Sequence, residues 1–277
     1  MGDKYNPYDN LSKHWKVNVA ETEAKKKLKE EVTLSDDFKG LTRSERTAIC
    51  EWAMKTSRTE ELTGQQVVRI LGLMDLAVTD AKSGLPVPAE VLLQANDEFR
   101  HAILYAQFAQ AASPIDAKEI AKRGNFSTSK FTSIFRVMDG LPVIYGGEPF
   151  VHFMVGLFFL DLAGLMTVNV YEESPFRALQ QIAISIKADE GRHVSMGREY
   201  LLRVRDGKLL ASDGRTVDGE RVVRDAVTTM FSYIDDFFGN DTSGLQQTLR
   251  KVGIKNTPNS ELKQAFRKKV NALLRLD

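Results

Sequence analysis

The sequence repeats one five-residue pattern, Asp-Glu-x-Arg-His, at residues 97–101 and again at 189–193. Both copies lie in segments whose apolar spacing is that of a helix rather than a strand. Residues three apart on an α-helix lie on one face about one turn apart, so the Glu and the His of each copy can point at the same place. Carboxylate and imidazole groups are ligands for iron and manganese. The pattern therefore predicts a metal site shared by two helices.

The simpler alternative is that these groups form ordinary ion pairs with neighbouring Arg or Lys. The chain has only four histidines, yet two of them complete the pattern, Glu98 with His101 and Glu190 with His193. That duplication favours the metal site. In ferritin-like bundles two such helices hold two iron or manganese ions together with one carboxylate from each of two further helices. We therefore expect one more acid on each partner helix.

One of these acids stands out in the segment 148–172, which is apolar nearly all round, as a buried helix is. Asp161 is the only acid in its middle, and a carboxylate in such surroundings must be protonated, paired or bound to metal. Asp161 lies thirteen residues before Ser174, where the chain turns, and Glu190 lies sixteen residues after Ser174. In an antiparallel pair these two positions meet at nearly the same height. Asp161 is thus the expected third-helix ligand.

The first-helix acid is less sharply determined. A capping signal at residues 41–44 opens a long helix, and Glu60 lies near the centre of its apolar stripe while Glu61 is turned away. We expect Glu60 to be the ligand and keep Glu61 in reserve. The alternative is that Glu60 pairs with Arg58 or Arg69 at the helix edge.

The segment 73–88 bears on the same choice. An uninterrupted helix would carry Glu60 too far from Glu98, so we expect this segment to be an excursion from the bundle. If the helix does run on, Asp75 is the fallback ligand.

We expect one domain over residues 1–277, with an N-terminal arm at 1–40, a metal-binding bundle at about 44–205 and C-terminal helices at about 217–277. The pattern predicts further bundle helices at 88–112 and 175–205, shorter helices at 115–123 and 127–139, a small hairpin or loop around 208–211, and helices at 219–239, 242–252 and 259–276.

Composition excludes several function classes. A net charge of +1 gives no electrostatic reason to expect nucleic acid or an anionic membrane as a partner. The single cysteine, Cys50, fits a reducing compartment, and residues 1–15 lack an apolar signal core. The apolar run 150–170 contains His152 and Asp161, which favours a buried core helix over a membrane span. We expect a cytoplasmic protein in which His152 is an ordinary buried histidine.

The paired motif resembles that of the ferritin-like di-metal oxygenase superfamily, in particular the hydroxylase subunits of bacterial multicomponent monooxygenases. The block from residues 156–161 to 189–193 is similar to the catalytic subunits of the phenylacetyl-CoA and benzoyl-CoA epoxidases. The resemblance covers roughly residues 45–205. It implies an all-α fold, a ferritin-like four-helix bundle core with additional peripheral helices.

The resemblance also implies a non-haem di-iron oxygenase that activates O2 and hydroxylates, epoxidises or N-oxygenates a small, largely apolar or aromatic substrate. Its cofactors would be two Fe ions, or Mn and Fe, with O2 as co-substrate. Its partners would be a reductase or ferredoxin and, as a further option, a second copy of the chain. Two carboxylates would bridge the metals and four other groups would complete their coordination; the bridging pair is Glu98 and Glu190, and the others are Glu60 with His101 and Asp161 with His193.

The Asp and Arg residues of the two motifs are candidates for positioning the metal ligands. Asp97 and Asp189 could fix the histidines by hydrogen bonds, and Arg100 and Arg192 could balance charge; surface ion pairs are the alternative. Two other functions stay open. Tyr105 falls where ribonucleotide reductase small subunits carry their radical tyrosine, and a ferritin-like protein could bind iron without oxygenase activity.

Overall fold

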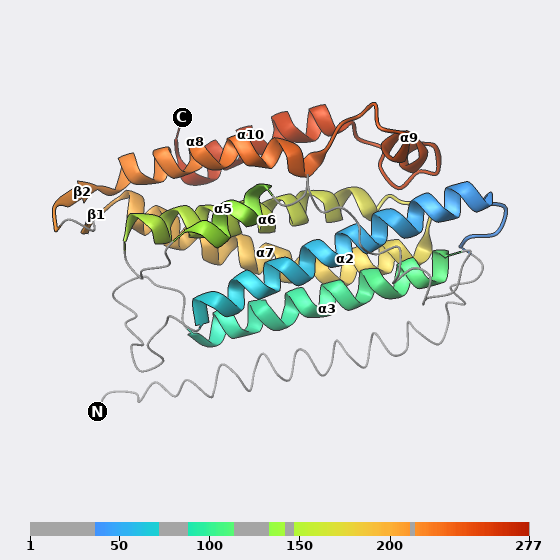
Figure 1. Cartoon of the computed structure of the whole chain (residues 1–277), viewed down its shortest axis with the longest axis horizontal. Coiled ribbons are helices and arrows are strands. Elements are labelled where there is room, and N and C mark those ends of the chain that lie inside the picture. Colours follow the sequence, from blue (N-terminus) through green and yellow to red (C-terminus); the bar gives the residue numbers. More distant parts are fainter. Residues whose placement is uncertain (1–36, 72–87, 114–132, 142–146, 211–213, 277) are drawn as a thin grey trace.

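The computed structural model describes residues 37–71, 88–113, 133–141, 147–210 and 214–276. Four long helices dominate this part of the chain (Figure 1): α2 (Arg43–Leu71), α3 (Pro88–Ala112), α6 (Glu148–Tyr171) and α7 (Arg177–Arg205). Helix α2 packs most extensively on α3, and α6 on α7, and the two pairs meet through α3 with α7 and α2 with α6. The predicted all-α, ferritin-like bundle is confirmed.

Helix α2 begins where the sequence predicts, because a capping box closes its first turn. The Thr42 hydroxyl accepts a hydrogen bond from the backbone N–H of Glu45 at 3.2 Å, and the Glu45 carboxylate accepts one from the backbone N–H of Thr42 at 2.8 Å. This reciprocal pairing satisfies two donors that a helix start otherwise leaves free. The helix then runs without a break past Glu60 to Leu71.

Helix α6 is the central core helix. It is the one helix in the described part of the chain that is long and apolar enough to span a membrane, but 72% of its most apolar window is buried inside the protein. Pro149 in its first turn is suited to a helix start. The side chains that cover it come from α7, from α8 (Gly219–Phe238) and from α10 (Asn259–Leu274).

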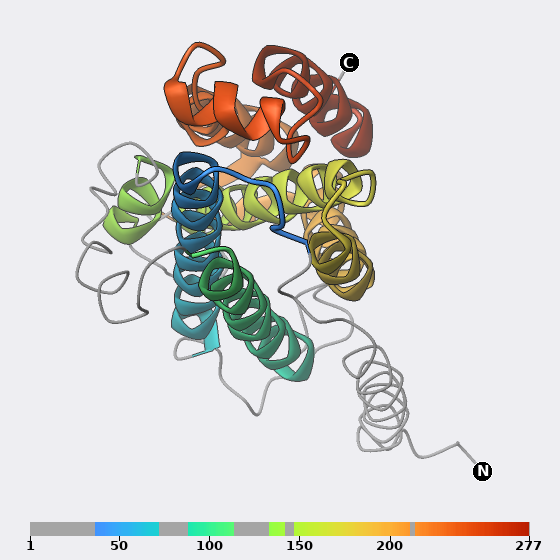
Figure 2. The same cartoon turned by 90° about the vertical axis from the view of Figure 1, so that its right-hand side faces the viewer.

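The C-terminal elements form a layer over α6, which Figure 2 shows from the end of the bundle. A short antiparallel hairpin, β1 (Lys208–Leu210) with β2 (Thr216–Asp218), leads from α7 into α8. Helix α9 (Gly244–Lys251) then packs against α2, and α5 (Ser133–Gly140) packs beside α8. The C-terminal helices lie within two residues of their predicted bounds.

Several predictions fall outside the described residues: the N-terminal arm up to residue 36, the helix at 115–123, residues 127–132 of the next helix, and the segment 72–87 with Asp75. The apolar pattern of α3 predicts that Val91, Leu92 and Ala95 face inward. Val91 and Ala95 are buried, but Leu92 is 60% exposed, so the prediction is wrong at that position.

Candidate metal centre

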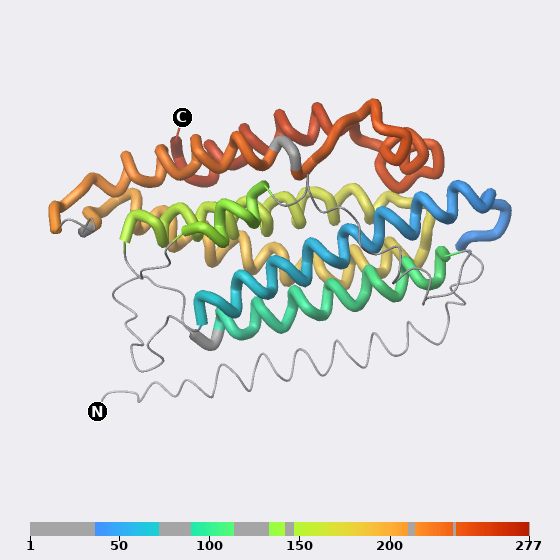
Figure 3. Tube along the Cα trace, viewed as in Figure 1, coloured from blue at the N-terminus to red at the C-terminus, as the bar shows by residue number. Residues whose placement is uncertain are grey.

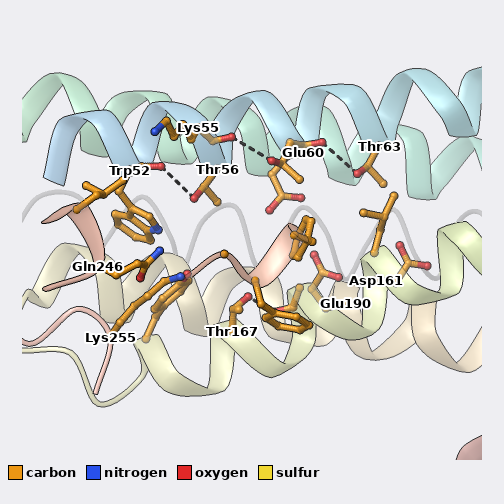
Figure 4. A pocket seen from close by; sticks show the side chains of 18 of the residues that line it. Trp52, Lys55, Thr56, Glu60, Thr63, Asp161, Thr167, Glu190, Gln246 and Lys255 are labelled. Atoms are coloured by element: carbon orange, nitrogen blue, oxygen red, sulfur yellow. Dashed lines mark hydrogen bonds between the residues drawn. The ribbon is translucent and has the colours of Figure 1, made fainter. Parts of the chain in front are cut away.

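All six predicted ligands come together between the four long helices. They form two groups whose candidate ligand atoms lie within 4.8 Å of one another, and Glu98 belongs to both. The first group contains Glu60, Glu98, His101 and Glu190, and the second contains Glu98, Asp161 and His193. Figure 4 shows the side chains of Glu60 from α2 and Glu190 from α7 pointing toward one another, with Asp161 of α6 to one side of them.

Glu60 reaches the group because α2 and α3 run antiparallel side by side, as Figure 3 traces. Glu60 lies eleven residues before the end of α2, and Glu98 lies ten residues after the start of α3, so the two acids stand level. The alternative pairing is wrong: Arg58 lies 2.6 Å from Glu61, and Arg69 lies 3.1 Å from Asp139.

Each histidine is held by the aspartate of the other motif. His101 Nε2 lies 3.3 Å from Asp189, and His193 Nε2 lies 3.3 Å from Asp97. With Nε2 so engaged, Nδ1 of both rings faces the carboxylates, and His193 Nδ1 is 3.0 Å from Glu98. A ligating imidazole usually has its second nitrogen fixed in this way.

The two arginines neutralise the aspartates. Arg192 lies 2.7 Å from Asp97 and 2.9 Å from Asp189, while Arg100 contacts Asp189 and donates to Ser185 at 3.0 Å. Burial opposes the ionisation of Asp189, but the His101 hydrogen bond and the Arg100 charge outweigh it and hold its pKa below the ordinary value. Burial lowers the pKa of His101 to about 4, so its ring is neutral at pH 7, the form that binds metal.

Three buried atoms at the centre of the site lack a hydrogen-bond partner: Glu98 Oε1, His101 Nδ1 and His193 Nδ1. Only one other side-chain atom of the described residues, Asn259 Nδ2, shares this property. A buried polar atom without a partner costs about 1–3 kcal/mol. Because the three atoms converge, one kind of group, a metal cation, would satisfy all of them at once.

The four buried carboxylates also need positive charge nearby, because burial disfavours their ionised form. Burial raises the pKa of Glu98 and of Asp161 to about 8, and raises those of Glu60 and Glu190 well above the ordinary value. Repulsion from Glu98 adds to the effect at the other three. Two divalent ions would carry as much positive charge as the four carboxylates carry negative charge, with both histidines neutral.

Sequence reasoning missed two supporting residues. The Gln94 amide donates to both carboxylate oxygens of Asp161 at 3.1 Å. Gln94 lies one helical turn before Glu98, and a polar residue at that inward position was a signal that could have found it. Gly164 leaves space for Glu190: a Cβ on Gly164 would lie 2.8 Å from the nearer carboxylate oxygen of Glu190.

A cavity of about 460 Å³ opens beside the four carboxylates and extends away from them, between α2, α6 and the C-terminal layer. Its walls include Trp52, Tyr171 and residues from the end of α8 to the loop after α9. Tyr105 does not line it but lies buried behind Trp52, with the two ring centroids 6.2 Å apart. His152 belongs to neither ligand group, and its Nδ1 lies 3.1 Å from the Glu148 carbonyl of its own helix.

The amino-acid sequence was compared with those of known protein families. The family described as phenylacetic acid catabolic protein matches residues 91–276, about two thirds of the chain. The match includes α6, α7, nearly all of α3 and the C-terminal layer, and leaves out α2 with Glu60. No curated protein matches the chain.

Proposed function

The chain belongs to the phenylacetic acid catabolic protein family, whose members are ferritin-like di-iron oxygenases, and from this premise we propose its reaction. The protein holds two iron ions on the six converging side chains and uses them with O2 to insert oxygen into a small, largely apolar substrate. The observation that carries the proposal is the convergence of Glu98 Oε1 and the two histidine Nδ1 atoms, all buried and without a partner.

The distances support a division of the ligands between two metal positions. Glu98 would contribute to both, since it lies 3.9 Å from His101 Nδ1 and 3.0 Å from His193 Nδ1. Glu190, 3.3 Å from His101 Nδ1, would be the second shared carboxylate. Glu60 would complete the position of His101, and Asp161 would complete that of His193.

When bound, the two iron ions supply the activation of O2. The protein's own groups do the rest of the work. Asp189 and Asp97 accept hydrogen bonds from the Nε2–H groups of His101 and His193, which favours the tautomer whose Nδ1 carries no proton. The apolar cavity wall holds the substrate body at the carboxylate end and limits access of water. Two electrons per turnover come from a separate reductase or ferredoxin.

The cavity favours an oxygenase over the two other functions. Its volume of about 460 Å³ falls within the range of small-molecule sites. A radical-generating small subunit built around Tyr105, or an iron-binding protein without oxygenase activity, needs no such space beside the metals. A manganese ion in one of the two positions remains compatible with the ligand set.

We further propose that residues 1–277 form one cytoplasmic domain. The end of α8, α9 and the loop that follows them complete the cavity whose other walls are α2 and α6. Separating the C-terminal layer from the bundle would therefore open the site.

Oxygen uptake by the reduced, iron-loaded protein tests the proposal. We expect about one O2 consumed per pair of iron ions, faster in the native protein than in a His101→Ala variant. A His152→Ala variant serves as the matched control, because His152 is a helix histidine outside both ligand groups, and it should react like the native protein. Uptake no faster than that of free ferrous iron would overturn the oxygenase assignment.

A further inference from the structure

The cavity has two chemically different ends, both visible in Figure 4. One end is formed by carboxylates, among them Glu60 and Glu190. At the other end lie Lys255, Gln246 and Trp52. Glu60 follows Trp52 by eight positions on α2, which corresponds to about 12 Å along the helix axis.

The fold fixes Lys255 at its place. Helix α9 ends in a Schellman motif: the Gly253 N–H bonds to the Arg250 carbonyl at 2.9 Å, and the Ile254 N–H bonds to the Leu249 carbonyl at 2.9 Å. Gly253 has φ +80°, and a Cβ there would lie 2.9 Å from Pro175. Ile254 is fully buried, so the residue after it starts from an anchored backbone.

The Lys255 side chain forms no hydrogen bond or ion pair with any described residue; its backbone N–H bonds to the Leu249 carbonyl at 3.4 Å. The acid that acts on it electrostatically, Asp241, is already engaged by the backbone N–H groups of Asn259 at 2.7 Å and Ser260 at 3.1 Å and by Arg250. Burial lowers the pKa of Lys255 to about 8, with Arg250 adding to the effect and Asp241 opposing it. An ammonium group so placed lacks a counter-ion.

The second lysine of the cavity differs in this respect. Lys55 also lines the wall, but its ammonium group lies 2.7 Å from Glu51 on the same helix. Its charge is therefore already balanced. Lys55 and Lys255 form a matched pair, one satisfied and one not.

The cavity wall is largely apolar. It includes Leu160 of α6, Phe237 and Phe238 at the end of α8, and Leu245 of α9. An elongated ligand with one anionic end and an apolar body would match the whole cavity: the anion would lie at Lys255 and the body would reach the carboxylates. A neutral or cationic ligand would leave Lys255 without a counter-ion, which is unfavourable in a partly buried site.

We propose that the cavity binds a small free carboxylic acid, with its carboxylate on Lys255 and the Gln246 amide and its apolar body directed to Glu60 and Glu190. This inference rests on the proposed oxygenase function, because it names the substrate class of the same site. It assigns Lys255 as the residue that selects an acid over an alcohol or an amine of the same shape.

Three ligands of one shape test the inference: 3-phenylpropionate, 3-phenylpropanol and 3-phenylpropylamine. Each is titrated calorimetrically into iron-loaded protein under nitrogen, so that no turnover occurs. We expect the acid to bind about tenfold or more tighter than the alcohol, as a charge-assisted contact predicts, and the amine to bind weakest. Trp52, one of two tryptophans in the chain, lines the cavity and gives a second readout by fluorescence.

Variants at the two lysines then locate the effect. Lys255→Met should weaken binding of the acid about tenfold relative to the alcohol, whereas Lys55→Met, which removes a charge that Glu51 already balances, should keep the native preference for the acid. Lys255→Gln provides a second substitution if the methionine variant folds poorly, which its melting temperature shows. Equal binding of acid and alcohol by the native protein, or unchanged acid binding by the Lys255 variants, would overturn the inference.

Two further arms separate this inference from its premise. Binding of 3-phenylpropionyl-CoA without binding of the free acid would overturn it in favour of a thioester ligand. Iron content, measured on each sample, tests the premise alone: full iron loading with no preference for the acid contradicts only the acid site. Preference for the acid in a protein that holds no iron contradicts only the oxygenase.

Discussion

The two halves of the metal centre start from the same pentapeptide but are supported differently. The half with His101 includes Glu60, which is partly exposed and faces the cavity. The half with His193 includes Asp161, which is 3% exposed and fixed through both carboxylate oxygens by Gln94. The difference predicts that Asp161 is held more rigidly than Glu60, whose side chain is hydrogen-bonded to Glu98 and borders the cavity. Sequence identity of the motifs therefore does not make the two positions equivalent.

The largest effect is expected from Gly164→Ala, which acts on Glu190, proposed above as the second carboxylate shared by both metal positions. Its Cβ would lie 2.8 Å from Glu190 Oε2, so Glu190 must move and metal binding should be lost while the helices remain folded. Metal content per chain and circular dichroism measure the two results. Gly191→Ala is the matched control, since its Cβ would meet nothing within 4 Å. Full metal content in Gly164→Ala would show that metal binding does not require the Glu190 carboxylate at its native position.

The pH dependence of the metal-free protein should be the next largest effect. Glu98 and Asp161 have pKa values raised to about 8 in the folded state, so the folded state binds more protons than the unfolded state between about pH 4.5 and 8. The stability they contribute is present below pH 4 and is lost as the pH rises through 8. Over two pH units the ionisation of each such group lowers the free energy of unfolding by a few kcal/mol, which corresponds to several degrees in melting temperature.

Melting temperatures at pH 6 and pH 8.5 check this, with and without metal. The metal-free protein should melt at a lower temperature at pH 8.5 than at pH 6. Asp161→Asn should reduce this difference in melting temperature, because it removes one of the two carboxyl groups that ionise over the interval. The metal-loaded protein should show little change. A metal-free protein that gains stability over this interval would contradict the raised pKa values.

The two aspartates offer a direct comparison of the halves. Asp189→Asn should weaken metal binding through His101, and Asp97→Asn should do so through His193, each by about 10- to 100-fold. Asp189 contacts both arginines and Asp97 only one, so the Asp189 variant should show the larger loss. Competition with a chelator measures both affinities. Native affinity in both variants would place these aspartates outside the support of the site.

The smallest effect is expected from Gln94→Leu, which removes both hydrogen bonds to Asp161 and one to Glu98. The affinity of the metal ion beside Asp161 should fall about tenfold and that of the other should fall less, giving two steps in a chelator titration. Gln65→Leu, an exposed position on α2, is the control and should give the native titration. A single-step titration with both ions weakened equally would contradict the difference between the halves.

The sequence predicted the bundle and the six candidate ligands because both depend on local periodicity. Glu98 with His101 and Glu190 with His193 each share one helix face, and Asp161 is conspicuous because α6 is otherwise apolar. Glu60 followed from the same reasoning, since the helical period separates it from Glu61.

The rest depends on contacts that periodicity does not encode. Which aspartate holds which histidine is decided by how α3 and α7 face each other. Gly164 matters only because Glu190 lies opposite it on another helix. The far end of the cavity brings Lys255 beside Trp52, two residues about two hundred positions apart in the sequence. No pattern within either segment indicates that contact.

The metal content of the purified protein tests the central claim most directly. After reconstitution with ferrous iron we expect about two metal ions per chain in the native protein and in Glu61→Ala, whose side chain pairs with Arg58 at the surface. Glu98→Ala should lose both ions, because Glu98 belongs to both ligand groups. A folded native protein that binds no metal, or a Glu98→Ala variant that keeps two ions, would contradict the account.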